Sequence, residues 1–277
     1  IVELFSIQNL EPQKAVDKAL PKIAIAIDLI SEKLNNNGRL IYIGAGTSGR
    51  LGVLDASECP PTFCTPKEMV QGIIAGGESA LTNSSEEKED DQSEAIRDLQ
   101  LTNISNTDCL CAISACGTTP YFISALKYAK SVGALTIAIS CVPEYQVNIS
   151  ADVDIRLITG PEILTGSTRL KAGTATKMAL NMISTGVMIK LGKVYSNRMV
   201  DVSASNNKLR NRAINIICDI TSASKEKAEE KLKLSNGSVK LSILSIISGL
   251  NINSARKLLD LNHGNLRKAI TSFKRSH

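Results

Sequence analysis

The chain has 277 residues, of which 43% are hydrophobic and 21% are charged. This composition is typical of a folded globular protein, and it excludes a disordered chain, a collagen-like repeat and a small disulfide scaffold. The net charge is only +5, aromatic residues make up 3% and Trp is absent. Neither a dense basic surface nor an aromatic stacking platform is indicated, so we expect no nucleic-acid partner.

The apolar runs and the Cys and His residues exclude further classes of protein and of site. No apolar run reaches the roughly 18 residues that a membrane-spanning helix needs, so we expect no membrane partner. The seven Cys residues form no C-x-x-C pair, which favours a reduced, cytoplasmic protein. The only two His residues are His263 and His277. Histidine-based triads and most zinc sites are thereby excluded from the rest of the chain, and we expect no metal.

Hydrophobic periodicity predicts an alternation of helices and strands. In chain order we expect a helix over 12–34, a strand over 40–43, a helix over 51–57, a strand over 69–74, a helix over 86–99, a strand over 109–113, a helix from 120 to 128, strands over 135–139 and 153–158, and a long helix over 167–191. This order predicts the α/β class, with a doubly wound parallel five-stranded sheet flanked by helices.

The last part of the chain has a different pattern. Beyond about residue 205 the strand signals disappear, and short helical patterns alternate with polar breaks. We therefore predict two domains, a sheet domain over 1–204 that includes the N-terminal helix, and a small all-helical domain over 205–277.

A glycine-rich loop follows the first predicted strand. The run from Gly44 to Gly49 has the form G-x-G-x-x-G and precedes a predicted helix. Such a loop lets backbone N–H groups approach an anion, and hydroxyls add further donors. The candidate phosphate ligands are Gly46, Thr47 and Ser48. The same pattern occurs in nucleotide-dependent oxidoreductases, but Glu78 lies farther along the chain than the usual ribose-binding acid.

Two further clusters of small and hydroxyl residues are candidates for the same ligand. The third strand ends in a loop over 114–120, and the run over 165–174 opens the long helix with hydroxyls and cations. Because ligands of open parallel sheets bind at the carboxyl ends of the strands, one sugar phosphate held between these segments is expected. The additional candidate ligands are Ser114, Cys116, Gly117, Thr119, Ser167 and Lys171.

Two carboxylates are candidates for acid–base chemistry. Glu58 precedes Pro60 and Pro61, which we expect to end the helix after the first loop. Glu89 lies within the acidic run over 86–91. From the residues alone, a capping or surface role for Glu58 and a solvated helical face for Glu89 also fit.

The longest motif carries a family resemblance. The runs 40–52 and 55–62, the second reading Asp-Ala-Ser-Glu-Cys-Pro-Pro-Thr, closely resemble the N-acetylmuramic acid 6-phosphate etherase family, which has the sugar isomerase (SIS) fold. Further matches lie at 74–78, 160–162, 171–175 and 199–202. The resemblance implies cleavage of the lactyl ether of N-acetylmuramic acid 6-phosphate, giving N-acetylglucosamine 6-phosphate and D-lactate. It also implies cell-wall sugar recycling in the bacterial cytoplasm, no cofactor, and a homodimer.

The resemblance also implies roles for individual residues. It places the proton donor of the family on Glu58 and its second catalytic carboxylate on Glu89. The chain departs from the family at Cys116, where Ser is usual, at Thr118, where Arg is usual, and at Cys64, where Gly is common. The C-terminal helices resemble the small ubiquitin-associated-like module of the family.

Two other functions of the same fold stay open from the sequence. A non-catalytic regulator, such as the glucokinase regulatory protein, would keep the phosphate-binding loops without needing the carboxylate pair. An aldose–ketose isomerase would convert sugar phosphates without releasing lactate. The presence of both Glu58 and Glu89 favours the etherase.

Overall fold

A computed structural model describes residues 1–202 and 207–276. The chain forms two compact units: residues 1–58 with 66–187, and residues 59–65 with 188–277. The domain boundary predicted between residues 204 and 205 lies outside the described residues, so that boundary stays a prediction. No helix within the described ranges is both long and apolar enough to cross a membrane.

The first unit is built on a parallel sheet, as predicted. Its five strands lie in the order β2-β1-β3-β4-β5, and every neighbouring pair is parallel. Their bounds are β1 Leu40–Gly44, β2 Val70–Ile74, β3 Cys109–Ile113, β4 Leu135–Ser140 and β5 Val153–Arg156. The residues of β1 and β3 are buried throughout, because helices cover both faces of the sheet.

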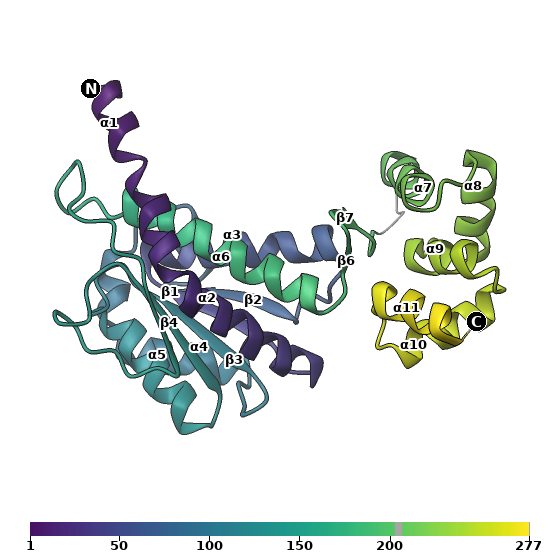
Figure 1. Cartoon of the computed structure of the whole chain (residues 1–277). Coiled ribbons are helices and arrows are strands. Elements are labelled where there is room, and N and C mark those ends of the chain that lie inside the picture. The colour runs from purple at the N-terminus through teal and green to yellow at the C-terminus, as the bar shows by residue number, and fades with distance from the viewer. Residues whose placement is uncertain (203–206, 277) are drawn as a thin grey trace. The chain divides into compact units, whose positions relative to one another are not determined.

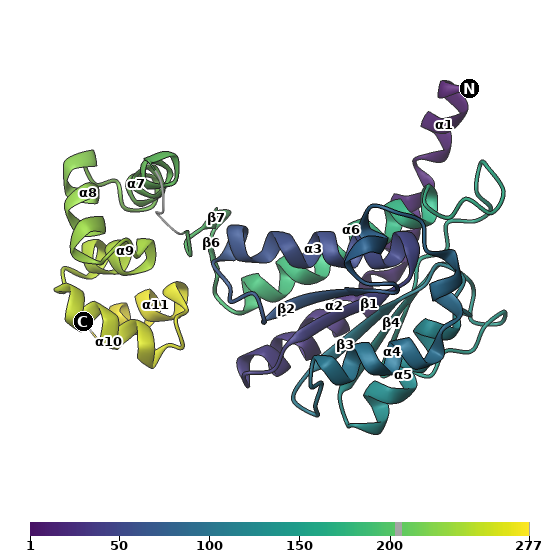
Figure 2. The same cartoon turned by 180° about the vertical axis from the view of Figure 1, so that it is seen from behind.

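The helices of this unit form two layers (Figures 1 and 2). Helices α2, α3 and α6 cover one face of the sheet, and α4 and α5 cover the other. Their bounds, with the short α1, are α1 Val2–Gln8, α2 Glu11–Asn35, α3 Gly46–Phe63, α4 Gln92–Leu101, α5 Pro120–Ser131 and α6 Lys171–Lys190. Successive side chains of β1 point to opposite faces of the sheet and therefore pack against both layers of helices. Ile41 and Ile43 pack in the cluster that holds Leu99 and Phe122, whereas Tyr42 lies against Gly52 of α3.

The helix predicted over 86–99 is interrupted, so that prediction is wrong in its extent. A 3-10 helix, η2, covers Glu86–Asp90, and α4 begins only at Gln92. Asp91 caps α4, because its Oδ1 accepts a hydrogen bond of 2.9 Å from the backbone N–H of Glu94. Asp is among the favoured N-cap residues, and the run of acidic residues before it conceals this helix start. The long helix also begins later than predicted, at Lys171.

The two prolines of α3 do not end it, contrary to the prediction. The helix continues through Pro60 and Pro61 to Phe63. The fixed φ of proline is compatible with a helix, and the cost of each proline is the lost N–H donor and the crowding of its ring against the carbonyl one turn earlier. The N–H of Cys64 still donates to the carbonyl of Pro60 at 2.9 Å. The helix ends at Cys64, whose φ of 53° is left-handed.

The left-handed φ of Cys64 leads to a prediction about stability. Cys64→Gly is expected to raise the free energy of unfolding by about 0.5–1 kcal/mol, since a residue with a Cβ is strained there and the gain exceeds the added freedom of the unfolded chain. Urea unfolding measures the change. The matched control is Cys64→Ala, which keeps the Cβ and should give no such gain; equal stabilisation by both substitutions would contradict the backbone explanation.

The second unit contains a hairpin and a helical bundle. The hairpin, β6 Val194–Tyr195 with β7 Arg198–Met199, was not predicted, because each strand has only two residues. The predicted helical C-terminal region is confirmed as α7 Asn207–Thr221, α8 Lys225–Leu234, α9 Val239–Ser248, α10 Ile252–Leu261 and α11 Leu266–Ser276. Lys240 of α9 is almost buried, and its Nζ lies 2.6 Å from Oδ2 of Asp201. This ion pair joins the segment after the hairpin to the bundle.

Candidate active site

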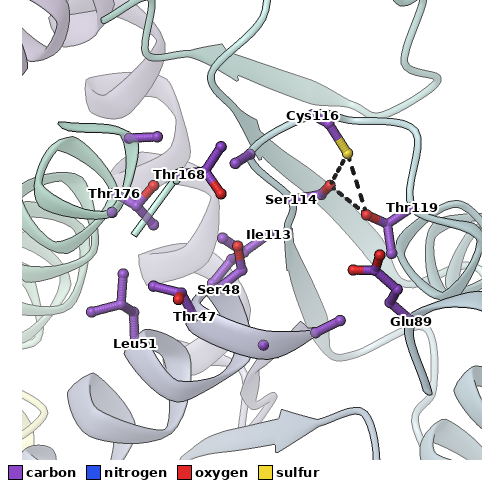
Figure 3. A pocket seen from close by; sticks show the side chains of 15 residues that line it. Thr47, Ser48, Leu51, Glu89, Ile113, Ser114, Cys116, Thr119, Thr168 and Thr176 are labelled. Carbon is purple, nitrogen blue, oxygen red and sulfur yellow. Dashed lines mark hydrogen bonds between the residues drawn. The ribbon is translucent and has the colours of Figure 1, made fainter. Parts of the chain in front are cut away.

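A pocket of about 260 Å³ lies in the first unit where β1 and β3 end. Figure 3 shows side chains from the two loops, from η2 and from the start of α6 around one space. The lining residues are Ala45, Gly46, Thr47, Ser48, Leu51, Glu89, Ile113, Ser114, Ala115, Cys116, Thr119, Thr168, Ala172, Gly173 and Thr176. Six of the predicted binding residues and one predicted catalytic residue are therefore brought together.

The first loop places a helix N-terminus at this pocket. Gly46 has a φ of 51° and turns the chain from β1 directly into α3. A Cβ on Gly49 would overlap the carbonyl oxygen of Gly44, so only glycine permits this tight turn. The first amides of a helix have no partners within it, and here they adjoin the hydroxyls of Thr47 and Ser48 at the pocket wall. The arrangement suits an anion.

The second loop contributes two hydroxyls and a thiol. Ser114 Oγ lies 3.0 Å from Thr119 Oγ1, and Cys116 Sγ lies 3.5 Å and 3.4 Å from these two oxygens. Figure 3 shows the three side chains as one hydrogen-bonded cluster. Gly117 does not line the pocket. Its N–H donates to Ser114 Oγ at 3.1 Å, so its contribution is to hold Ser114 in place.

The surroundings of Cys116 make its thiol acidic. Burial raises the pKa of Cys116, but hydrogen bonds from Ser114, Thr118 and Thr119 outweigh that effect and lower the pKa to about 7. Thr118 Oγ1 donates to the sulfur at 3.2 Å. The thiolate of Cys116 is therefore favoured relative to that of an ordinary cysteine.

Alkylation tests this ionisation. The rate at which iodoacetamide modifies Cys116, followed by peptide mass spectrometry, should rise with pH around a midpoint of about 7, because the thiolate is the reactive form. In Thr118→Val the sulfur loses one donor, so the midpoint should move upward. A midpoint near the ordinary thiol value of 9.0 in the unaltered protein would contradict this account.

The two candidate carboxylates lie in different places. Glu89 lines the pocket, and Figure 3 shows its carboxylate on the side where Thr119 lies. Glu58 does not line the pocket and is exposed on α3. It follows Ser48 by ten residues, which corresponds to about 15 Å along the helix axis. Within one chain, the two carboxylates therefore do not face the same space.

The third predicted cluster is only partly at the pocket. Ser167 and Lys171 do not line it. Lys171 is buried, and its Nζ donates to Oε1 of Gln8 at 2.8 Å. The N-terminus of α6, which we expected to hold an anion, is occupied by Glu162, whose carboxylate accepts from the backbone N–H groups of Lys171 and Ala172 at 3.0 and 2.9 Å.

Four other residues of this region, Thr168, Ala172, Gly173 and Thr176, line the pocket instead. Thr168, Ala172 and Thr176 follow one another at intervals of four residues. Ala172 and Thr176 lie on one face of α6, and their spacing in the sequence could have indicated them, whereas Thr168 lies in the turn before the helix. Gly173 lies beside the first loop, because a Cβ there would meet Thr47 Cγ2 at 3.5 Å.

A buried carboxylate that the sequence reasoning did not use connects two helices of the first unit. Asp55 of α3 accepts hydrogen bonds from Asn181 Nδ2 at 2.7 Å and from Ser184 Oγ at 3.1 Å, both on α6. Burial raises the pKa of Asp55, and these hydrogen bonds partly oppose it. The interaction joins α3 and α6, both of which contribute residues to the pocket lining. Across residues 1–202 and 207–276, no group of three or more His, Cys, Asp or Glu side chains could hold a metal ion.

Comparison with known proteins agrees with this architecture. The SIS domain family matches residues 89–186, the N-terminal SIS domain family of glucokinase regulatory protein matches residues 22–130, and the C-terminal lid domain family of that protein matches residues 196–240. A Bacteroides fragilis protein, named for a proposed phosphosugar isomerase role in capsule formation, superposes with a TM-score of 0.52 at 20% identity, over 70% of this chain and 94% of that one. The chain is therefore a SIS-domain protein.

Full-length relatives identify the family within this class. An N-acetylmuramic acid 6-phosphate etherase of Prochlorococcus marinus (strain NATL1A) is 61% identical over 99% of this chain and 88% of its own length. The etherase of Nostoc sp. (strain PCC 7120) is 53% identical over 99% of this chain and 89% of its own length. The chain belongs to the N-acetylmuramic acid 6-phosphate etherase family.

Proposed function

We propose that this protein cleaves the lactyl ether of N-acetylmuramic acid 6-phosphate, giving N-acetylglucosamine 6-phosphate and D-lactate, in the recycling of cell-wall amino sugar in the bacterial cytoplasm. In the structure, one observation supports the proposal most strongly. A single pocket holds two hydroxyl-rich loops that suit a phosphate and a carboxylate, Glu89, that suits proton transfer. The family of the chain supports the choice of substrate.

The reaction needs a base and an acid at different atoms. In the open-chain sugar the C1 aldehyde makes the C2 proton acidic, and a base can remove it. The C3–O bond then breaks as the C2=C3 double bond forms, and an acid protonates the leaving lactyl oxygen. Water finally adds across the double bond, with its hydroxyl on C3 and a proton on C2. We assign proton removal to Glu89 and protonation of the lactyl oxygen to Glu58.

The position of Glu58 bears on the quaternary structure. Because Glu58 is exposed and does not line the pocket of its own chain, it can act only if a second copy of the chain brings it to the reacting oxygen. We therefore propose a homodimer in which each pocket receives Glu58 of the partner subunit. A C2 dimer would complete both pockets in the same way.

The phosphate is assigned to the two loops. The N-terminus of α3 with Thr47 and Ser48 would hold it on one side, and Ser114, Cys116 and Thr119 on the other. No metal or other cofactor has a role in this proposal.

Ser48→Ala tests the phosphate assignment. The change removes one hydroxyl donor to a charged group, an effect of about 1.5–3 kcal/mol, which corresponds to KM raised by about ten-fold or more with kcat little changed. Steady-state kinetics with the phosphorylated sugar measures it. Ser131→Ala at the end of α5, where the exposed Ser131 Oγ donates to the carbonyl of Tyr128, is the matched control. An unchanged KM in Ser48→Ala would put the phosphate elsewhere.

A non-catalytic sugar-phosphate regulator is the second candidate, because two of the matching families are named after glucokinase regulatory protein. A regulator would bind the substrate without releasing D-lactate. Equilibrium binding of the sugar phosphate combined with a lactate assay separates the two functions.

A further inference from the structure

The segment that carries Glu89 is held by a second carboxylate, Glu94. Oε1 of Glu94 accepts a hydrogen bond of 3.1 Å from the backbone N–H of Gly76, in the loop after β2. Oε2 of Glu94 lies 3.3 Å from Nζ of Lys88, which directly precedes Glu89 in η2. One side chain thus contacts both the sheet edge and η2.

Glu94 occupies a position in α4 at which a Glu side chain often caps its own helix. Asp91 is the N-cap of α4, so Glu94 is the third residue of the first turn. In a capping box, a Glu at this position returns its side chain to the N-cap residue. Here the carboxylate points to Gly76 and Lys88 instead, while its own N–H still donates to Asp91. The side chain is therefore used for a tertiary contact rather than for capping.

Packing leaves little room for η2 to move toward the sheet. Gly76 has a φ of 84°, and a Cβ there would meet Lys88 Cγ at 3.2 Å and Ser85 Cβ at 3.3 Å. The loop after β2 thus lies directly against η2. The side chain of Glu94 is 14% exposed, whereas that of Lys88 is 40% exposed. Because the Glu94 carboxylate is largely shielded from water, its contacts contribute to holding η2 in place. The ion pair is weaker than a fully buried one, since Lys88 is partly exposed to water.

From this arrangement we propose that Glu94 is a positioning residue for Glu89, acting through Lys88 and Gly76 to keep the Glu89 carboxylate in the pocket. The inference rests on the proposed function, in which Glu89 removes the C2 proton. Proton transfer depends steeply on the distance and direction between base and proton. A small shift of η2 should therefore lower turnover while the phosphate-binding loops, which lie on other segments, still bind substrate.

Glu94→Gln is the principal test. The amide oxygen can still accept from the N–H of Gly76, but the charge opposite Lys88 is lost. We expect kcat to fall about ten-fold, with KM within about two-fold of the unaltered value. Lys88→Met removes the same ion pair from the other side and should have a similar effect. Because the two residues act as one unit, the double variant should be no worse than either single variant.

The matched control is another Lys–Glu pair of the same unit. Lys14 and Glu11 of α2 form an exposed ion pair of 2.8 Å, and neither residue lines the pocket. Glu11→Gln should leave kcat and KM unchanged. Thermal unfolding of every variant, measured beside the kinetics, separates loss of folded protein from loss of turnover. If Glu94→Gln and Lys88→Met only lower Tm and turn over normally well below it, Glu94 is merely structural and the inference is wrong.

A final pair of variants separates this inference from the proposed function. In a Glu89→Gln background, adding Glu94→Gln should cause no further loss of kcat, since there is no carboxylate left to position. A further ten-fold loss there would contradict an action through Glu89. Normal turnover in Glu94→Gln with a large loss in Glu89→Gln overturns the positioning role alone. Normal turnover in Glu89→Gln itself overturns both the role of Glu89 and the inference built on it.

Discussion

Replacing Glu89 with Gln is expected to lower kcat for D-lactate release by about 10²–10⁴-fold, with KM little changed. Gln keeps the size and polarity of the side chain but cannot accept the C2 proton. Because removal of that proton precedes the loss of lactate, exchange of the C2 hydrogen with deuterated water should fall in parallel. Exchange is followed by NMR of the substrate.

Glu87→Gln is the matched control, since Glu87 lies in the same acidic 3-10 helix and does not line the pocket. It should exchange and turn over normally. A normal exchange rate in Glu89→Gln would show that another group removes the proton.

The second large effect is expected at Glu58. Glu58→Gln should also lower kcat by about 10²–10⁴-fold, because the lactyl oxygen would leave without a proton donor. The two variants should differ in one respect. Since Glu58 acts after C2 deprotonation, C2 exchange should survive better in Glu58→Gln than in Glu89→Gln.

The proposed dimer leads to a further prediction for the two variants Glu58→Gln and Glu89→Gln. If Glu58 acts in the pocket of the partner subunit, mixing Glu58→Gln and Glu89→Gln chains by unfolding and refolding should restore activity. Half of the dimers would be hybrids, each with one intact pocket, so about a quarter of the unaltered rate is expected. No recovery, with hybrids present by native mass spectrometry, would contradict delivery of Glu58 by the partner subunit.

The sheet could be predicted from the sequence because its strands are short apolar runs buried on both faces. Cys109–Ile113 is one such run, and β3 has the predicted bounds. The two loops at the strand ends could be predicted for the same reason. A glycine-rich turn after a buried strand has few alternatives, and both loops meet at one edge of the sheet.

The parts that could not be predicted depend on contacts that the pattern of residue types does not reveal. Lys171 looked like an anion ligand, but Gln8, 163 residues away, accepts from its side chain, and Glu162, nine residues away, accepts from its backbone N–H. Asp91 stands within an acidic run, and only the structure shows which of those residues caps α4. The sequence also left open whether Glu58 is a catalytic residue or a surface residue of the helix, because local sequence does not define where a pocket closes.

The central claim is tested most directly by incubating the purified protein with N-acetylmuramic acid 6-phosphate and measuring D-lactate with a stereospecific dehydrogenase. We expect one D-lactate and one N-acetylglucosamine 6-phosphate for each substrate consumed, with ¹⁸O from labelled water at C3 of the sugar and none in the lactate. Substrate binding without lactate release would contradict the account and favour a regulator. Label in the lactate would contradict cleavage of the ether on the sugar side.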